Sequence, residues 1–324
     1  MGRSMRVIAW LLAGLLLLSG CSGDGSGGGV DRFRLMVPNT PGGGYDVTAR
    51  TAVSIAERAG LLDDRVAVFN LAGDQGVIAL SRLLDETGNG RLAMMMGLGV
   101  VGATIATGSD RRVTDGTPIA RLLEEPEAVL VPADSPLRDI DDLEQAWRAD
   151  PSRLDLGGGS AVGGPDHLMT MQLAQAAGID PRVVQYGTFD GGGALLPALL
   201  DGRIDVAVSS LVEYTEQIRS GQLRVLAVSG PDRVPWVDAP TLTESGIDLV
   251  FTNWRGVIAP PGISDTDRTR LVQLFNDLEQ TPEWRDALAE NSWTAAFLDG
   301  DEFAAFLRSE DERVRDSLAE LGLG

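Results

Sequence analysis

The sequence predicts an α/β fold in which parallel strands are covered by helices. Short apolar stretches of strand length alternate along the chain with helical segments. Alternation of this kind is typical of parallel sheets with helices on both faces. The chain has 324 residues, enough for two domains, and its 44% hydrophobic and 23% charged residues are typical of a globular protein. The expected strands are residues 33–37, 66–69, 92–96, 128–131, 154–156, 183–186, 206–209 and 225–228.

The first strand leads through a glycine-rich loop into a helix. Residues 33–37 read F-R-L-M-V, and residues 46–59 have a helical pattern without Pro or Gly. Between them lie Pro41 and three glycines at 42–44. Backbone N–H groups of a glycine run can come close to a ligand, and those at a helix N-terminus favour an anion. The loop therefore predicts either an anion site or a tight turn without a ligand.

Two further glycine-rich loops stand between a strand and a helix. Residues 157–164 (G-G-G-S-A-V-G-G) precede an expected helix over 167–177, and residues 187–193 (G-T-F-D-G-G-G) precede one over 194–200. In parallel sheets, ligands bind where strands lead into helices. Three such loops favour one shared anion pocket over three unrelated turns.

The chain begins like an exported protein. Two arginines precede an apolar run over residues 7–18, which is shorter than the roughly 20 residues of a transmembrane span. The run ends in L-S-G-C, which resembles the lipobox of bacterial lipoproteins and implies cleavage of a signal peptide (1–20) and a lipid on Cys21. A plain signal peptide is the alternative. Cys21 is the only cysteine, so no internal disulfide is possible, and residues 21–29 form a Gly/Ser-rich tether at the membrane.

The charge of the chain excludes one class of partner. The formal net charge is −20, and all 27 basic residues are arginine. Such a surface repels nucleic acid, and no basic patch with interleaved aromatic residues offsets it. An anionic ligand is still compatible, because backbone amides can build a local anion site whatever the mean charge.

Seven motifs stand in order between residue 33 and the C-terminus. They are V-P-N-T-P-G-G-G-Y-D (37–46), the Gly-Ser loop followed by His167 and Leu168, Y-G (186–187), D-G-R-I-D (201–205), G-Q-L-R-V-L-A-V (221–228), P-T-L-T-E-S-G (240–246) and W-R-G-V-I-A-P-P-G (254–262). Together they resemble the substrate-binding proteins of tripartite tricarboxylate transporters, often called the Bug family.

The resemblance implies a type II periplasmic-binding-protein fold with two doubly wound α/β domains and a ligand cleft between them. The first domain would be discontinuous, with residues 30–126 and 250–324, and the second would hold residues 127–249. C-terminal helices over 267–280 and 301–321 would return to cover the first domain. The protein would capture a small carboxylate and deliver it to the membrane permease subunits of such a transporter, with no catalysis, cofactor or metal.

Carried over residue by residue, the resemblance places the ligand between the loop at 40–46 and two loops of the second domain, at 159–164 and 188–192. Tyr45 stands where the family more often has a small hydroxyl residue, and residues 74–75 replace the small residues usual there. The expected ligand-binding residues are Thr40, Gly42, Gly43, Gly44, Tyr45, Asp46, Asn70, Gly73, Gly159, Ser160, Ala161, Gly163, Thr188, Phe189, Asp190 and Gly191.

Several residues also have structural explanations. Asp46 begins a helix, where a carboxylate is favourable, and we expect it to brace the loop more than to touch an anion. His167, the only histidine, is expected to hydrogen-bond at a helix start. For Ser160, a hydrogen bond to a carboxylate and a turn or N-cap role are both open. Trp254 is expected to pack, and for Arg255 an ion pair with a carboxylate between the domains is open.

Two other functions stay open. Residues 97–102 match G-x-G-x-x-G after a strand, as in dinucleotide-binding enzymes. They fall in the third strand-helix unit and not in the first, and residues 115–116 look like a turn where an acidic strand end is required. The sequence therefore favours a receptor over an enzyme. A lipoprotein that presents its ligand to a sensor kinase would use the same fold and cleft, so the sequence does not separate transport from sensing.

Overall fold

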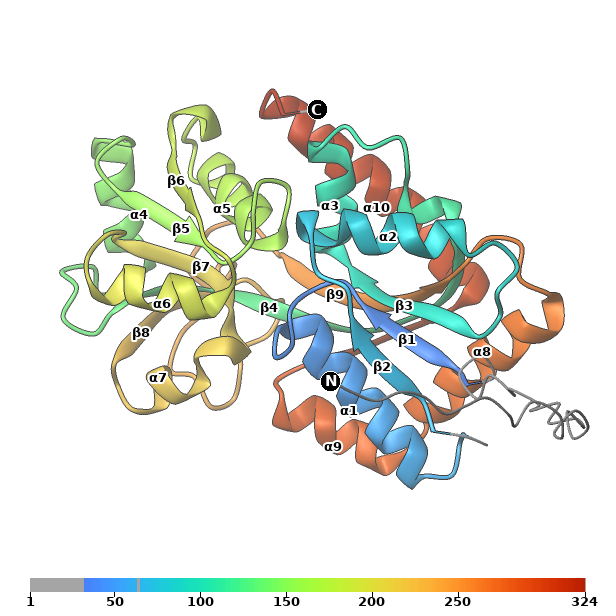
Figure 1. The fold of residues 1–324 in the computed structure, drawn as a ribbon. Coiled ribbons are helices and arrows are strands. Elements are labelled where there is room, and N and C mark those ends of the chain that lie inside the picture. The colour runs from blue at the N-terminus through green and yellow to red at the C-terminus, as the bar shows by residue number, and fades with distance from the viewer. Residues whose placement is uncertain (1–31, 63–64, 324) are drawn as a thin grey trace, which may run out of the picture. The chain divides into compact units, whose positions relative to one another are not determined.

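The computed structural model describes residues 32–62 and 65–323, in which strands and helices alternate as predicted (Figure 1). The predicted signal peptide (1–20), the lipid site Cys21 and the tether (21–29) lie outside the described residues. Across the described ranges, we find no helix with the length and apolarity needed to cross a membrane.

The strands of the described chain form one mixed sheet. They are β1 (Arg34–Val37), β2 (Ala67–Asn70), β3 (Leu92–Gly97), β4 (Thr117–Pro132), β5 (Asp155–Gly158), β6 (Gln185–Thr188), β7 (Val206–Ser210), β8 (Leu223–Val228), β9 (Thr252–Ala259) and β10 (Thr294–Asp299). Their order is β2-β1-β3-β9-β4-β7-β5-β6, and β8 and β10 also pair with β4.

The prediction of parallel strands is right for the outer strands and wrong for the central ones. The pairs β1–β2, β1–β3, β5–β6 and β5–β7 are parallel, whereas every pair that includes β4 or β9 is antiparallel. The chain leaves the part of the sheet around β1 along β4 and returns to it along β9, so these two strands run in opposite directions. The sequence prediction also covered only residues 128–131 of β4, because Pro118, Pro126 and the acidic pair at 124–125 are disfavoured in strands.

The helices lie between the strands and at the C-terminus. They are α1 (Gly44–Arg58), α2 (Val77–Asp85), α3 (Leu98–Ala106), α4 (Ile140–Ala149), α5 (Pro165–Ala176), α6 (Gly192–Leu200), α7 (Thr215–Arg219), α8 (Asp265–Glu279), α9 (Pro282–Glu290) and α10 (Gly300–Glu320), with short 3-10 turns η1 (Asp74–Gly76), η2 (Val113–Asp115), η3 (Pro181–Val183) and η4 (Leu211–Tyr214). Side chains of Asp139, Ser264 and Thr281 accept a backbone N–H three residues ahead, which fixes where α4, α8 and α9 begin.

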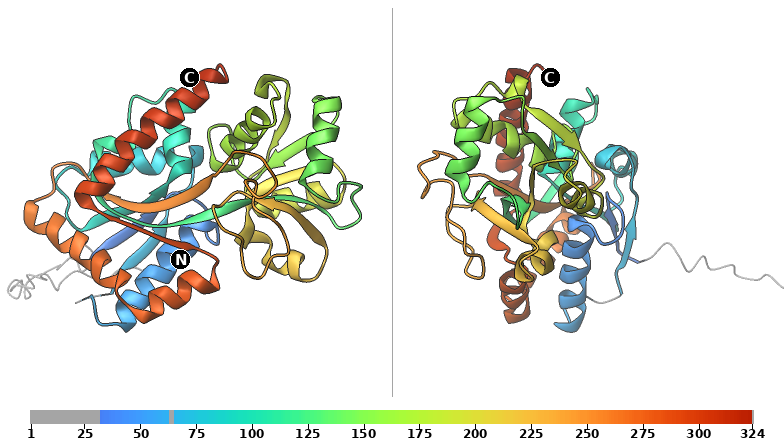
Figure 2. Two further views of the ribbon diagram at one scale, coloured as in Figure 1. Left: turned by 180° about the vertical axis from the view of Figure 1, so that it is seen from behind. Right: turned by 90° about the vertical axis from the view of Figure 1, so that its left-hand side faces the viewer.

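Alternation along the strands divides the apolar core between the two faces of the sheet. In β1, Leu35 and Val37 share a buried cluster with α1, α8 and α9, whereas Met36 shares one with α2, α3 and α10. In β7, Val208 packs with α4 and α5, and Ala207 packs with α6. Helices therefore cover both faces of the sheet, and Figure 2 shows α10 running across one of them.

The sheet has two halves that are joined by two crossings of the chain. We call β1, β2, β3, β9, β10 and residues 117–126 of β4 the first half, and β5 to β8 with residues 127–132 of β4 the second half. The buried Ser229 hydroxyl ties the two crossings together. It accepts the N–H of Glu127 at 2.8 Å and donates to the carbonyl oxygen of Phe251 at 2.7 Å.

The G-x-G-x-x-G stretch has a packing role in this fold. Gly97 ends β3, and the next two glycines lie in α3. A Cβ atom on Gly99 would lie 2.9 Å from the hydroxyl oxygen of Tyr45, and one on Gly102 would lie 1.7 Å from the carbonyl oxygen of Gly163. These glycines therefore let α3 approach two neighbouring loops, which accounts for them without a nucleotide.

Candidate functional site

A cavity of about 480 Å³ lies where loops from both halves of the sheet meet. Its walls come from the loop before α1, the first turns of α3 and α5, the loop before α6, and parts of β7, η4 and β9. The lining residues are Pro38, Asn39, Thr40, Gly43, Gly44, Tyr45, Gln75, Gly99, Gly159, Ser160, Ala161, Gly164, Pro165, Asp166, Thr188, Phe189, Asp190, Gly191, Ser209, Ser210, Glu213, Asn253 and Arg255.

The N-terminus of α1 forms one wall of the cavity. Its N-cap residue, Gly43, has no side chain to cap the helix. The backbone N–H groups of Gly44 and Tyr45 have no hydrogen-bond acceptor among the described residues. Such N–H groups carry the positive end of the helix dipole, so this wall favours a negatively charged ligand group.

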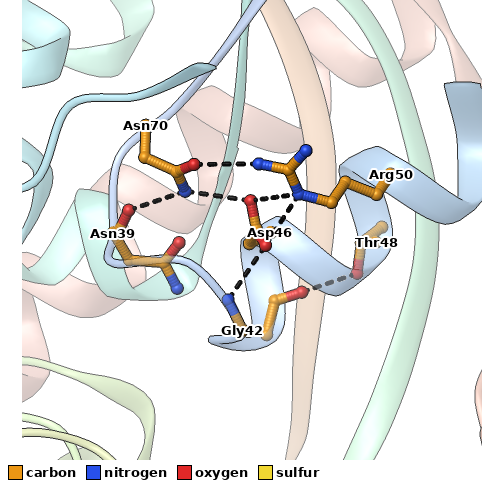
Figure 3. Close-up of polar contacts among 7 residues, drawn as sticks. Asn39, Gly42, Asp46, Thr48, Arg50 and Asn70 are labelled. Atoms are coloured by element: carbon orange, nitrogen blue, oxygen red, sulfur yellow. Dashed lines mark hydrogen bonds and ion pairs between the residues drawn. The ribbon is translucent and has the colours of Figure 1, made fainter. Parts of the chain in front are cut away.

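Asp46 holds the loop before α1 in shape (Figure 3). Its carboxylate accepts the N–H of Gly42, Nε of Arg50 and Nδ2 of Asn70, each at 2.9 Å, and Asn70 also donates to the carbonyl oxygen of Asn39 at 3.0 Å. Burial raises the pKa of Asp46, but the hydrogen bonds from Arg50, Gly42 and Asn70 outweigh burial and lower it below its ordinary value. Asp46 thus braces the loop as a charged carboxylate.

The loop before α5 forms the facing wall, in the second half. Asp166 holds this loop with two hydrogen bonds. Its carboxylate accepts the N–H of Gly159 at 2.6 Å, and its own N–H donates to Oγ of Ser160 at 3.0 Å. The N–H of Gly191 donates to the carbonyl oxygen of Gly159 at 2.9 Å, which joins this loop to the one before α6. In the part of the chain that the structure describes, the N–H groups of Ser160 and Ala161 have no acceptor.

A buried ion pair lies at the boundary between the halves. Arg255 on β9 pairs with Glu125 on β4 and donates to Oγ1 of Thr48 at 2.8 Å. Nε1 of Trp293 donates to the other oxygen of Glu125 at 3.1 Å. The guanidinium also lies 6.0 Å from the ring centre of Tyr45, whose pKa burial raises to about 12, so the phenol stays neutral. The ion pair that the sequence left open for Arg255 is therefore present, and Arg255 lines the cavity.

Three carboxyl groups gather on the side of the second half. Asp166 and Glu213 line the cavity, and Glu127 is fully buried near them. Burial raises the pKa of Asp166 to about 6, and desolvation together with Asp166 raises the pKa of Glu213 to about 7. Burial, Asp166 and other nearby carboxylates raise the pKa of Glu127 well above its ordinary value. The N–H of Gly192 donates to Glu213 at 3.1 Å.

Most of the predicted ligand-binding residues line the cavity, and a few do not. Those that line it are Thr40, Gly43, Gly44, Tyr45, Gly159, Ser160, Ala161, Thr188, Phe189, Asp190 and Gly191. Those that do not are Gly42, Asp46, Asn70, Gly73 and Gly163. Hydrogen bonds within the loop occupy the first three, Gly73 precedes η1 with a φ of +139°, and Gly163 packs on α3. Gly42, Asp46 and Asn70 thus brace the loop before α1 without lining the cavity.

Several lining residues were missed from the sequence. Asp166 lies two residues after a predicted loop, Ser209 ends a predicted strand and Ser210 follows it, so their positions were usable signals. Glu213 and Asn253 carry no such signal, because only the folding of η4 and β9 against the other loops brings them to the cavity.

His167 lies beside the cavity without lining it. Its Nδ1 accepts the N–H of Gly163 at 3.3 Å, and its ring meets the ring of Tyr186 edge-on at 5.1 Å. Burial lowers the pKa of His167 to about 4, so the imidazole is neutral. The histidine therefore holds the start of α5, as its position in the sequence predicted.

We expect the proton NMR signal of His167, the only histidine, not to titrate above about pH 5 in the folded protein. The folded-state pKa of about 4 lies below the ordinary value of 6.5, so the unfolded chain binds the proton first as the pH falls. The free energy of unfolding should therefore decrease between pH 6.5 and pH 4, and His167→Asn should remove this part of the decrease. Titration near pH 6.5 in the folded state would contradict the burial described here.

The sequence of residues 52–323 matches the family model described as "Tripartite tricarboxylate transporter family receptor". A relative from Pseudomonas sp. strain P51, the "UPF0065 protein in tcbD-tcbE intergenic region", is 28% identical over 298 residues, which cover 89% of this chain and 85% of that protein. Protein BugT of Bordetella pertussis is 26% identical over 296 residues, covering 90% of this chain and 89% of BugT.

Solved structures share the fold. A TctC solute-binding protein from Polaromonas is 25% identical with a TM-score of 0.68, over 90% of this chain and 98% of that one. A Rhodopseudomonas palustris protein solved with adipate is 23% identical (TM-score 0.79, 90% and 97% covered), and MatC of the same organism, solved with malate, is 22% identical (TM-score 0.76, 89% and 98% covered). The predicted α/β fold of periplasmic solute-binding proteins is thereby confirmed.

Proposed function

Because the chain belongs to the tripartite tricarboxylate transporter receptor family, we propose that it captures a small carboxylate in this cavity and delivers it to the permease subunits of such a transporter. The observation that carries the proposal is the set of N–H groups of Gly44, Tyr45, Ser160 and Ala161, which line one cavity from both halves and have no acceptor among the described residues. A carboxylate offers two oxygens that accept such donors.

Capture requires the two walls to approach each other. We propose that the halves act as domains, with residues 30–126 and 250–324 in the first and 127–249 in the second, and that they close by hinge motion about the crossings that Ser229 joins. No bond is made or broken in this mechanism. Receptors of this family work outside the cytoplasm, and we propose that a lipid on Cys21 holds this one at the outer face of the cytoplasmic membrane.

A variant that fills the cavity tests the proposal. Titration calorimetry with a panel of mono-, di- and tricarboxylates, with NAD included, should find at least one acid that binds. Ala161→Trp should weaken that binding at least 100-fold, because residue 161 lines the cavity. Ala176→Trp, at an exposed position on α5, is the control and should bind normally. A panel in which no acid binds, or an acid that binds the cavity-filled variant as well as the original protein, would refute the proposal.

A further inference from the structure

Three carboxyl groups gather at the cavity without an ion-pair partner of their own among the residues described. Asp166 and Glu213 line it, and Glu127 is buried near them. Within the described ranges, no arginine or histidine forms an ion pair with any of the three. Arg255, the only arginine in the lining, is already paired with Glu125. Arg255 also attracts Glu127 and Glu213, but one guanidinium shared among these carboxyl groups leaves the cavity with more acids than cations.

Buried acceptors without a donor in the described chain lie in the cavity lining and beside it. Asn253 lines the cavity with only 8% of its surface exposed, and its Oδ1 has no partner among the described residues. Both carboxyl oxygens of Glu127 also lack a partner there. Glu127 pairs across the sheet with Ser210, which lines the cavity, and directly opposite residues of antiparallel strands share one face. Buried acceptors of this kind are costly unless a donor reaches them.

A protonated amine on the ligand supplies both the further positive charge and the hydrogen-bond donors that these groups lack. It carries one positive charge and up to three N–H donors, and ionised partners make its hydrogen bonds stronger than neutral ones. The free N–H groups of Ser160 and Ala161 belong to the loop that Asp166 braces, so donors for an acid and acceptors for an amine are neighbours in the same wall.

We propose that the ligand of this receptor is a small carboxylic acid that also bears a protonated amine, and that Asp166, Glu213 and Asn253 hold the amine. This inference rests on the proposed function and narrows its substrate class. The amides of α1 and of the loop before α5 bind the carboxylate end, and the acidic side of the cavity binds the other.

Matched acids that differ only in the amine test the inference. Succinate against aspartate and glutarate against glutamate are such pairs, and putrescine carries amines without an acid. We expect each amino acid to bind at least tenfold more tightly than its plain partner, and putrescine to bind weakly.

Two variants assign this preference to the named acids. Asp166→Asn and Glu213→Gln each keep an oxygen that can accept from Gly159 or Gly192, so the loops keep their shape. Each should reduce the ratio of amino-acid to plain-acid affinity at least tenfold, whatever its effect on the two affinities together. Glu216→Gln, at an exposed position on α7, removes the same charge outside the cavity and should change nothing.

The outcomes separate the inference from the function on which it rests. Plain acids that bind as tightly as their amino partners would overturn the inference and leave the carboxylate receptor intact. Plain acids that bind tightly only with added Ca²⁺ or Mg²⁺ would overturn it by making a metal ion the missing charge. Putrescine binding as tightly as the amino acids would refute the role of the carboxylate, and binding by no acid of either kind would refute the proposed function as well.

Discussion

Gly102→Ala is expected to lower the free energy of unfolding by about 3 kcal/mol, at the upper end of what overpacking costs, and to weaken ligand binding. The new Cβ atom would lie 1.7 Å from the carbonyl oxygen and 2.5 Å from the carbonyl carbon of Gly163. Both contacts are with backbone, so no side-chain rotation relieves them. The loop at 159–164 must therefore move, and with it the N–H groups of Ser160 and Ala161. Urea unfolding and calorimetry measure the two effects.

Gly193→Ala is the matched control for this variant. Gly193 lies in the first turn of α6, and an added Cβ atom would meet nothing within 4 Å. Alanine is favoured over glycine inside helices, so stability should stay the same or rise slightly. If Gly102→Ala unfolds and binds like this control, α3 does not approach the loop as closely as the structure places it.

Arg255→Met is expected to lower the free energy of unfolding by about 3–5 kcal/mol, the usual cost of leaving one partner of a buried ion pair alone. Glu125 is 1% exposed and would keep only the hydrogen bond from Trp293. The variant should also bind ligand less well, because it removes the only guanidinium in the cavity lining and a donor to Thr48. Urea unfolding measures the loss of stability.

The double variant Arg255→Met with Glu125→Gln separates the cost of an unpaired buried charge from the cost of lost packing. Glutamine keeps an acceptor for Trp293 but leaves no buried charge, so the double variant should be more stable than Arg255→Met alone. Arg182→Met removes an exposed partner of Asp180 and should leave stability unchanged. Equal stabilities of the single and double variants would show that the buried charge of Glu125 is not what makes the loss large.

Local patterns in the sequence predicted much of this fold. Residues 33–37 and 46–59 anticipate β1 and α1, although the helix begins earlier, at Gly44, where glycine as a poor helix former gave no signal. The central strands were harder to predict. Most of β4 was missed since prolines and glutamates interrupt its apolar pattern, and the partners of β4 are set by contacts between distant segments.

The cavity, too, could be predicted from the sequence only in part. Its glycine-rich walls follow from the sequence because a glycine run between a strand and a helix has few uses other than turns and anion sites. Glu213 and Asn253 could not be predicted, since each is an ordinary residue until the sheet register and η4 place it at the cavity. Gly97, Gly99 and Gly102 left a nucleotide site open as an alternative in the sequence, and in the structure their lack of a side chain permits close packing.

The most direct test of the central claim is a crystal structure of the protein with the tightest-binding acid of the panel. We expect the carboxylate oxygens to lie within hydrogen-bond distance of the N–H of Gly44 or Tyr45 on one wall and of Ser160 or Ala161 on the other. A carboxylate bound outside the cavity, or inside it but away from both walls, would refute the proposed binding mode.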